Sequence, residues 1–293
     1  RVMVYYNPKN WFGLIFQFHQ SDTFRQMFWV LMAMAVYSGI VVCLELNFVE
    51  WFGFKSTVQI HSLLGFVIGL FLVFRTNTAY ERWSEGRKQW GSLVNASRNL
   101  SVKVTAHLET EAQDERKFFA DMIGDYAFAM KEHLRQGVIP EEMVCPENKK
   151  LAEEAEVHIP NHIAQQLYAK LIDMRKKEAI TADQYLSLDI ELREFTNAIG
   201  ACERIRNTPI PYSYSLFIKK FIFIYTLTMP FGLVYDFNYW TIPIVCFVLY
   251  VFGSIELLAE EIEDPFGRDT NDLPTDDISQ RIRLGIKELY GVQ

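Results

Sequence analysis

The sequence has few cysteines and no excess of basic residues, and each shortage excludes a class of protein. Its 293 residues include four cysteines, at positions 43, 145, 202 and 246, and no two form a C-x-x-C pair. This spacing fits neither a disulfide framework nor a zinc site, and Cys43 and Cys246 lie inside apolar runs, as buried cysteines do. Lys and Arg number 29 against 36 Asp and Glu, and the net charge of −7 argues against a nucleic-acid partner.

The chain also lacks the motifs of several common enzyme classes. It has no G-x-S-x-G nucleophile elbow, no phosphate-binding P-loop and no dinucleotide-binding fingerprint. The pattern shows no alternation of strands with helices and no internal repeat. Half of all residues are hydrophobic, and their distribution along the chain is the next clue to the class of protein.

These hydrophobic residues concentrate in long runs. Residues 27–44 and 58–74 carry no charge, and the runs 221–235 and 237–255 are separated only by Asp236. A membrane-spanning helix needs about 20 mostly apolar residues. The third run is short, but apolar residues just before it extend it across two lysines that could snorkel to the interface. We therefore predict an all-α membrane protein with four transmembrane helices, paired as two hairpins.

Basic residues set the predicted orientation. The loop between the first two runs holds one basic residue, Lys55, and the connection at Asp236 holds none, whereas basic residues gather at the opposite ends of the runs. The positive-inside rule then places both termini in the cytoplasm, and we expect a multi-pass protein of the inner membrane. The predicted organisation is a cytosolic N-terminal segment over residues 1–26, transmembrane helices 1 and 2 over 27–75, a helical cytosolic domain over 76–213, transmembrane helices 3 and 4 over 214–256, and a cytosolic acidic tail over 257–293.

The expected cytosolic parts are helical by pattern. Apolar residues recur at steps of three and four, and Thr181 followed by Gln184 is typical of a capping box. Three prolines and many acids between residues 137 and 160 indicate a loop with a short helix. The predicted helices cover residues 93–108, 116–134, 161–177, 181–205 and 277–290.

The second apolar run carries the best candidate site. Gln59, Leu63, Val67 and Phe71 recur every four residues and so share one helical stripe. Around an axis formed by several copies, such a stripe could line a narrow hydrophobic neck, and such constrictions gate by dewetting. Ordinary helix packing produces the same pattern, and spacing alone favours that simpler interpretation.

Other polar clusters suggest different chemistry. Glu81 and Glu85 lie one helical turn apart, as paired catalytic carboxylates can, although a salt-bridged face is the commoner reason. Asp269 and Asp272 follow a glycine turn and could offer oxygen ligands to a hard cation, but the order is not that of an EF-hand. A further histidine pair, His158 and His162, is interrupted by Pro160, and we interpret both as surface histidines.

Three segments resemble the bestrophin-like family in the form found in bacteria. They are FLVFRTNTAYERWSEGRKQWGSLVNASRNL over residues 71–100, ACERIRNTPIPYSY over 201–214 and EDPFGRDTNDLP over 263–274. The resemblance implies a homopentameric ion channel with one central pore. It also implies a neck at Gln59, Leu63 and Val67, although this family usually has bulky apolar residues at all three positions.

The resemblance implies further pore positions as well. Ile60 and Phe71 are possible additional pore-lining residues, and a register shifted by one would use Ile60, Leu64 and Ile68. A second, cytosolic aperture is expected near residues 180–184, with Ile180, Asp183 and Gln184 as its candidates.

Animal members of the family carry a calcium clasp, and Asp269 and Asp272 match its aspartates. Bacterial members are generally not regarded as calcium-activated, so calcium is a possible cofactor here but not the expected one. Animal and plant members favour chloride, while some bacterial members resemble sodium-permeable cation channels. We expect a chloride-type channel for small monovalent ions and keep the cation channel as the alternative. An alternative of another class is a metal-dependent membrane enzyme that uses the carboxylates near Glu81 and Glu260.

Overall fold

The computed structural model describes residues 22–48, 58–108, 112–135, 137, 139–153 and 157–291, and these parts contain helices and no β-strand. The predicted N-terminal segment up to residue 21 and most of the predicted loop with Lys55 lie outside the described residues. In chain order the elements are α2 (Asp22–Phe48), α3 (Val58–His107), α4 (Gln113–Leu134), η2 (Pro140–Glu142), α5 (Pro146–Glu153), α6 (Ile159–Lys176), α7 (Ala182–Asn207), α8 (Tyr212–Phe237), η3 (Asn238–Trp240), α9 (Thr241–Glu263) and α10 (Thr275–Tyr290).

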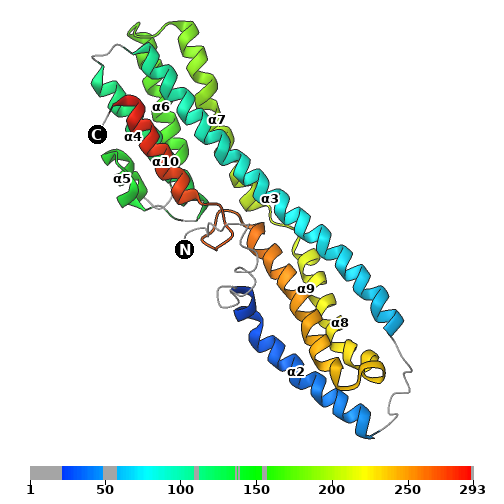
Figure 1. Ribbon diagram of the computed structural model, residues 1–293. Coiled ribbons are helices and arrows are strands. Elements are labelled where there is room, and N and C mark those ends of the chain that lie inside the picture. Colours follow the sequence, from blue (N-terminus) through cyan, green and yellow to red (C-terminus); the bar gives the residue numbers. More distant parts are fainter. Residues whose placement is uncertain are drawn as a thin grey trace. The chain divides into compact units, whose positions relative to one another are not determined.

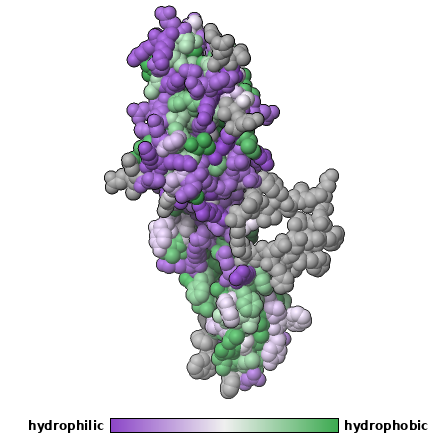
Figure 2. Space-filling view, turned by 90° about the vertical axis from the view of Figure 1, so that its left-hand side faces the viewer, coloured by the Kyte–Doolittle hydropathy of each residue, from purple (hydrophilic) through white to green (hydrophobic). Residues whose placement is uncertain are grey.

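The described residues form two compact units. The first, which we call the apolar unit, comprises the described residues within 22–81 and 209–263. The second, which we call the polar unit, comprises those within 82–208 and 264–291. On the face shown in Figure 2, hydrophobic side chains dominate the described surface of the apolar unit and hydrophilic ones that of the polar unit. The surface of the apolar unit therefore suits an apolar environment, and that of the polar unit suits water.

In the apolar unit, α8 and α9 form a helical hairpin through η3, and α2 packs against both of them (Figure 1). The Tyr37 hydroxyl on α2 donates a hydrogen bond to the Leu227 carbonyl on α8 at 3.0 Å. The described residues hold three stretches long and apolar enough to cross a membrane, Thr23–Asn47, Val58–His107 and Tyr212–Glu263. The sequence predicts four membrane helices, and the third stretch contains two of the predicted ones, α8 and α9.

The helix α3 is longer than the sequence pattern suggests. It runs unbroken for 50 residues, through the predicted apolar run 58–74 and the predicted helix 93–108. Residues 58–107 contain no proline, so no residue interrupts the backbone hydrogen bonds. The charged segment that follows Arg75 therefore continues the helix.

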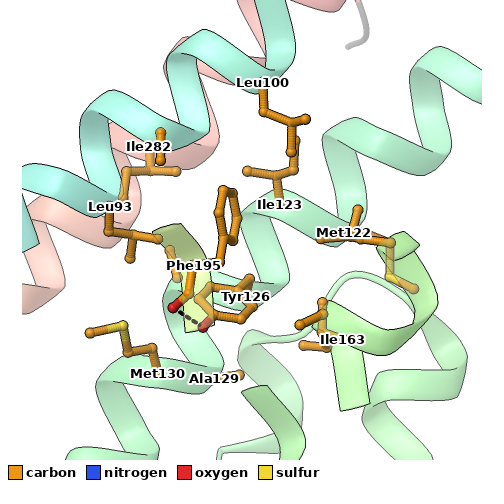
Figure 3. Close-up of a cluster of buried hydrophobic side chains, with 14 of the residues drawn as sticks. Leu93, Leu100, Met122, Ile123, Tyr126, Ala129, Met130, Ile163, Phe195 and Ile282 are labelled. Atoms are coloured by element: carbon orange, nitrogen blue, oxygen red, sulfur yellow. Dashed lines mark hydrogen bonds between the residues drawn. The ribbon is translucent and has the colours of Figure 1, made fainter. Parts of the chain in front are cut away.

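The core of the polar unit surrounds α4. This helix packs against α6, α7 and α10 (Figure 1), and 14 of its 22 residues are buried. Figure 3 shows the centre of this core, where the Tyr126 hydroxyl donates to the Phe195 carbonyl at 2.6 Å. The predicted helices over 116–134, 161–177, 181–205 and 277–290 are confirmed as α4, α6, α7 and α10, with ends shifted by a few residues.

Acidic and basic groups inside this core are paired. The buried Asp125 carboxylate on α4 accepts hydrogen bonds from the Val144 and Cys145 amides, at 2.7 and 2.9 Å, and from the Asn148 side chain. These bonds fix the start of α5 against α4. The buried Lys131 ammonium lies 2.7 Å from Glu142 and 2.9 Å from Asp276, which joins α4 to η2 and α10.

Candidate functional site

One face of the first turns of α3 is apolar and exposed within the protomer. Leu63 is 66% exposed, Phe66 is 71% exposed and Ile60 is 60% exposed, and Gln59 is exposed as well. Val67 is partly buried. A face of this kind either contacts lipid or faces other copies of the chain, since apolar side chains in such numbers do not stay in water.

The opposite face of α3 packs inside the protomer. Ile68 and Leu72 are 1% exposed, and both belong to the core of the apolar unit. Phe71 is partly buried against this core, and its ring contacts the Phe217 ring on α8 with centroids 5.7 Å apart. Of the expected pore residues, the structure thus exposes Gln59, Ile60 and Leu63 and leaves Phe71 in an intramolecular contact.

Gly65 permits a close approach between α3 and α8. A Cβ atom at this position would lie 2.7 Å from the Tyr225 hydroxyl oxygen. That hydroxyl donates to the His61 carbonyl at 3.1 Å, and the His61 ring lies 3.3 Å from the Thr228 hydroxyl. These partners on α8 lie about 160 residues away in the chain, so the local sequence does not indicate them.

Arg75 marks the polar end of this buried face. It is 1% exposed, and its Nη2 lies 2.6 Å from the Glu263 carboxylate while its Nε lies 3.6 Å from Glu256. The second oxygen of Glu263 accepts from the Ile210 amide at 2.8 Å. The cluster therefore ties α3 to the end of α9 and to the segment before α8, and sequence reasoning did not identify these partners.

The expected aperture residues lie around the start of α7. Ile180 is 3% exposed and belongs to the core of the polar unit, whereas Asp183 is exposed in the first turn of α7. The Gln184 side chain accepts from the Thr181 amide at 2.8 Å, and the Thr181 hydroxyl accepts from the Gln184 amide at 3.2 Å. The predicted capping box is confirmed, so Gln184 serves the end of its own helix.

The two aspartates of the expected calcium-clasp remnant form a turn. The Asp269 amide donates to the Asp272 carboxylate at 2.6 Å, and the Asp272 amide donates to the Asp269 carbonyl at 3.3 Å. Asp272 is 3% exposed and Asp269 is exposed. The Asp272 side chain thus closes this turn, and a Cβ on Gly267 would lie 2.7 Å from its Oδ2 atom.

Two of the carboxylates considered for an enzyme, Glu85 and Glu260, take part in ion pairs. Glu85 accepts from Gln89 at 2.6 Å and lies 3.7 Å from Lys88 on the same helix. Glu260 lies 2.8 Å from Lys219 across the α8–α9 hairpin. Such pairs are the ordinary arrangement on a charged helical face.

Comparison with known proteins identifies the family. Residues 3–288 match the sequence family described as Bacterial/Fungal Bestrophin protein. The chain belongs to the bestrophin family. Among curated bestrophin relatives, a voltage-dependent anion channel-forming protein of Synechocystis is 35% identical over 87% of each chain. The voltage-dependent anion channel-forming protein YneE of Escherichia coli K12 is 31% identical over 98% of this chain and 94% of its own.

Solved structures agree with this assignment. The crystal structure of a bacterial bestrophin homologue from Klebsiella pneumoniae superposes with a TM-score of 0.83 at 28% identity, and it covers 91% of this chain and 99% of its own. The crystal structure of a membrane protein that carries a single glycine-to-alanine substitution gives a TM-score of 0.84 at 27% identity, with the same coverage of each chain. The family and the channel names of the relatives indicate an ion channel of the membrane, not an enzyme.

Proposed function

We propose that this bestrophin is a homopentameric anion channel of the chloride type, which conducts small monovalent ions through a neck lined by α3. The observation that carries the proposal is the exposed apolar face of α3 at Leu63, in a chain whose relatives are named as voltage-dependent anion channel-forming proteins. Five copies around an axis would bring this face together. A neck of that kind gates by dewetting, because water leaves a narrow apolar constriction.

The packing of α3 supports one register for the neck. Gln59 and Leu63 are exposed, so they are accessible to a pore, whereas Ile68 is buried inside the protomer. The stripe Gln59, Leu63 and Val67 is therefore favoured over the shifted one. At the cytosolic aperture, Asp183 is the most accessible of the expected residues.

The proposed topology has four membrane crossings, which are α2, the first part of α3, α8 and α9. Membrane segments lie within residues 27–75 and 214–256, and residues 1–26, 76–213 and 257–293 are cytosolic, as the basic residues indicate. The protein would then lie in the inner membrane with both termini in the cytoplasm. Native mass spectrometry in detergent tests the assembly, and the expected mass is that of five 34.2-kDa chains.

Bilayer recording tests the activity and the sign of the ion. Purified protein in planar bilayers under asymmetric sodium chloride should carry single-channel current that reverses near the chloride equilibrium potential. Reversal near the sodium potential would favour a cation channel, a second candidate supported by the net charge of −7, which attracts cations. Absence of current would contradict both proposals.

The neck has its own test. Leu63→Ala combined with Val67→Ala widens the proposed constriction and should raise the open probability. A matched double variant on α2, Val30→Ala with Val36→Ala, removes exposed apolar side chains outside the neck and should gate like the unmodified protein. Equal gating in the two double variants would contradict the neck assignment.

A further inference from the structure

Two histidines and a glutamate from three different helices converge in the polar unit. His133 lies in the last turn of α4, His158 is the N-cap of α6 and Glu203 lies on α7. The Nε2 atoms of both histidines lie 2.7 Å from the same Oε1 atom of Glu203. The side chains are 25%, 32% and 29% exposed, so the cluster is reachable from solvent.

Two imidazole nitrogens and a carboxylate oxygen are a ligand set that zinc prefers. We propose that His133, His158 and Glu203 form a binding site for one zinc-class divalent transition-metal ion, with water as the fourth ligand. The three ligand atoms lie within 4.8 Å of one another. Ligands of a tetrahedral zinc ion are about 3.3 Å apart, given bonds of about 2.0–2.1 Å, so the two histidines need to move outward only slightly.

One charged group of each sign lies at the cluster: Glu203 is a ligand, and the Arg206 guanidinium donates to the His133 carbonyl at 2.8 Å. A second group of converging ligands, Glu132, Glu142 and Asp276, already encloses the ammonium of Lys131 at 2.7–3.0 Å. The Lys131 ammonium occupies the position between these three carboxylates that a metal ion would need. At His133, Glu203 supplies the negative charge, and the two imidazoles bring no fixed charge when neutral.

The neighbouring thiol does not compete for the metal. Cys202 precedes Glu203 on α7 and is buried. Its sulfur is not among the ligand atoms that converge here, which are those of His133, His158 and Glu203.

Metal binding has a structural consequence at α6. The His158 Nδ1 atom accepts a hydrogen bond from the Asn161 amide at 3.2 Å and thereby caps the helix. A neutral imidazole that binds metal through Nε2 carries its proton on Nδ1, where it can no longer accept. Zinc binding would therefore release this cap, and the first turn of α6 should exchange its amide protons faster when the site is filled.

Titration with zinc chloride tests the site. Tag-free, full-length protein stripped of metal with a chelator should bind one zinc ion per chain by calorimetry, and it should not bind magnesium chloride at the same site. Glu203→Gln and His133→Ala should each weaken binding by roughly tenfold or more. His162→Ala serves as the matched control, because His162 contacts Gln166 on α6 instead, and it should bind zinc like the unmodified protein.

Two further measurements check the folding of the variants and identify the ligands of the bound zinc. Size-exclusion profiles in the presence of chelator show whether each variant still folds. X-ray absorption at the zinc edge of the unmodified protein should show imidazole scattering from two histidines. Absence of tight zinc binding, equal affinity in Glu203→Gln, or a zinc spectrum without imidazole would each overturn the proposal.

Discussion

The guanidinium of Arg75 lies 2.6 Å from the Glu263 carboxylate, and these two residues lie 188 positions apart in the chain. Arg75 follows the apolar run on α3, and Glu263 is the last residue of α9. A buried arginine requires a charged partner because an unpaired buried charge is strongly destabilising. The pair therefore fixes where α3 and α9 meet within the apolar unit.

Removing Arg75 should destabilise the protein strongly. Arg75→Met removes the guanidinium that lies against Glu256 and Glu263, and breaking a buried pair in this way costs about 3–5 kcal/mol. Thermal unfolding in detergent measures the change. Lys88→Ala is the control, since Lys88 is 72% exposed and its pair with Glu85 contributes little. Similar unfolding temperatures for the two variants would show that the Arg75 pair does not hold the helices together.

Gly65 and Gly69 should respond differently to the same substitution. Gly65→Ala places a methyl group 2.7 Å from the Tyr225 hydroxyl, and overpacking of this kind costs about 1–3 kcal/mol. Gly69→Ala meets no atom within 4 Å and gains helix propensity, so the protomer should tolerate it. Unfolding in detergent compares the two variants.

A double variant shows whether the Tyr225 hydroxyl causes the clash. Tyr225→Phe removes that oxygen, after which the nearest atom lies 3.4 Å from the new methyl group. Gly65→Ala should then cost much less in the Tyr225→Phe background than in the unmodified protein. An equal cost in both backgrounds would place the clash elsewhere.

The sequence predicted the helices well because hydropathy and capping are local. The apolar runs and the Thr181–Gln184 capping box depend on neighbouring residues, and both appear as expected. The unbroken course of α3 was missed because charged residues after Arg75 resemble an interhelical segment, although the absence of proline permits a continuous helix.

The local sequence pattern could not predict contacts between residues that lie far apart in the chain. His158 was interpreted as a surface histidine beside His162, but the fold brings it to His133 and Glu203 instead. Nothing in the local sequence signals this, since 70 residues separate His133 from Glu203. The partners of Arg75 were missed for the same reason.

Asp276 should make stability depend on pH in the acidic range. Hydrogen bonds from Arg135, together with Lys131, hold the pKa of the Asp276 carboxyl well below its ordinary value of 3.8. A carboxyl with a lowered pKa in the folded state stabilises the protein above its unfolded pKa and loses this contribution as pH falls further. The contribution of Asp276 should thus be complete above about pH 5 and decline below about pH 4.

A pair of neighbouring variants isolates this effect. Asp276→Asn should lower the unfolding temperature at pH 7, and its difference from the unmodified protein should shrink as pH falls below about 4. The difference should be small, because the Asp276 side chain is 60% exposed. Asp277→Asn, on the same first turn of α10, serves as the control for the helix dipole. A pH-independent difference for Asp276→Asn would rule out the ion pair as its cause.

Opposite faces of α3 should separate stability from gating. Ile68 is buried in the protomer, so Ile68→Ala should cost about 2–5 kcal/mol and lower the unfolding temperature. Leu63 is 66% exposed, so Leu63→Ala leaves no such cavity within the protomer, and its effect should be on open probability in bilayer recordings. Both changes remove apolar atoms from one helix within two turns of each other, which makes each variant the control for the other. The reverse outcome, a gating change from Ile68→Ala with Leu63→Ala silent, would favour the register of Ile60, Leu64 and Ile68 for the neck.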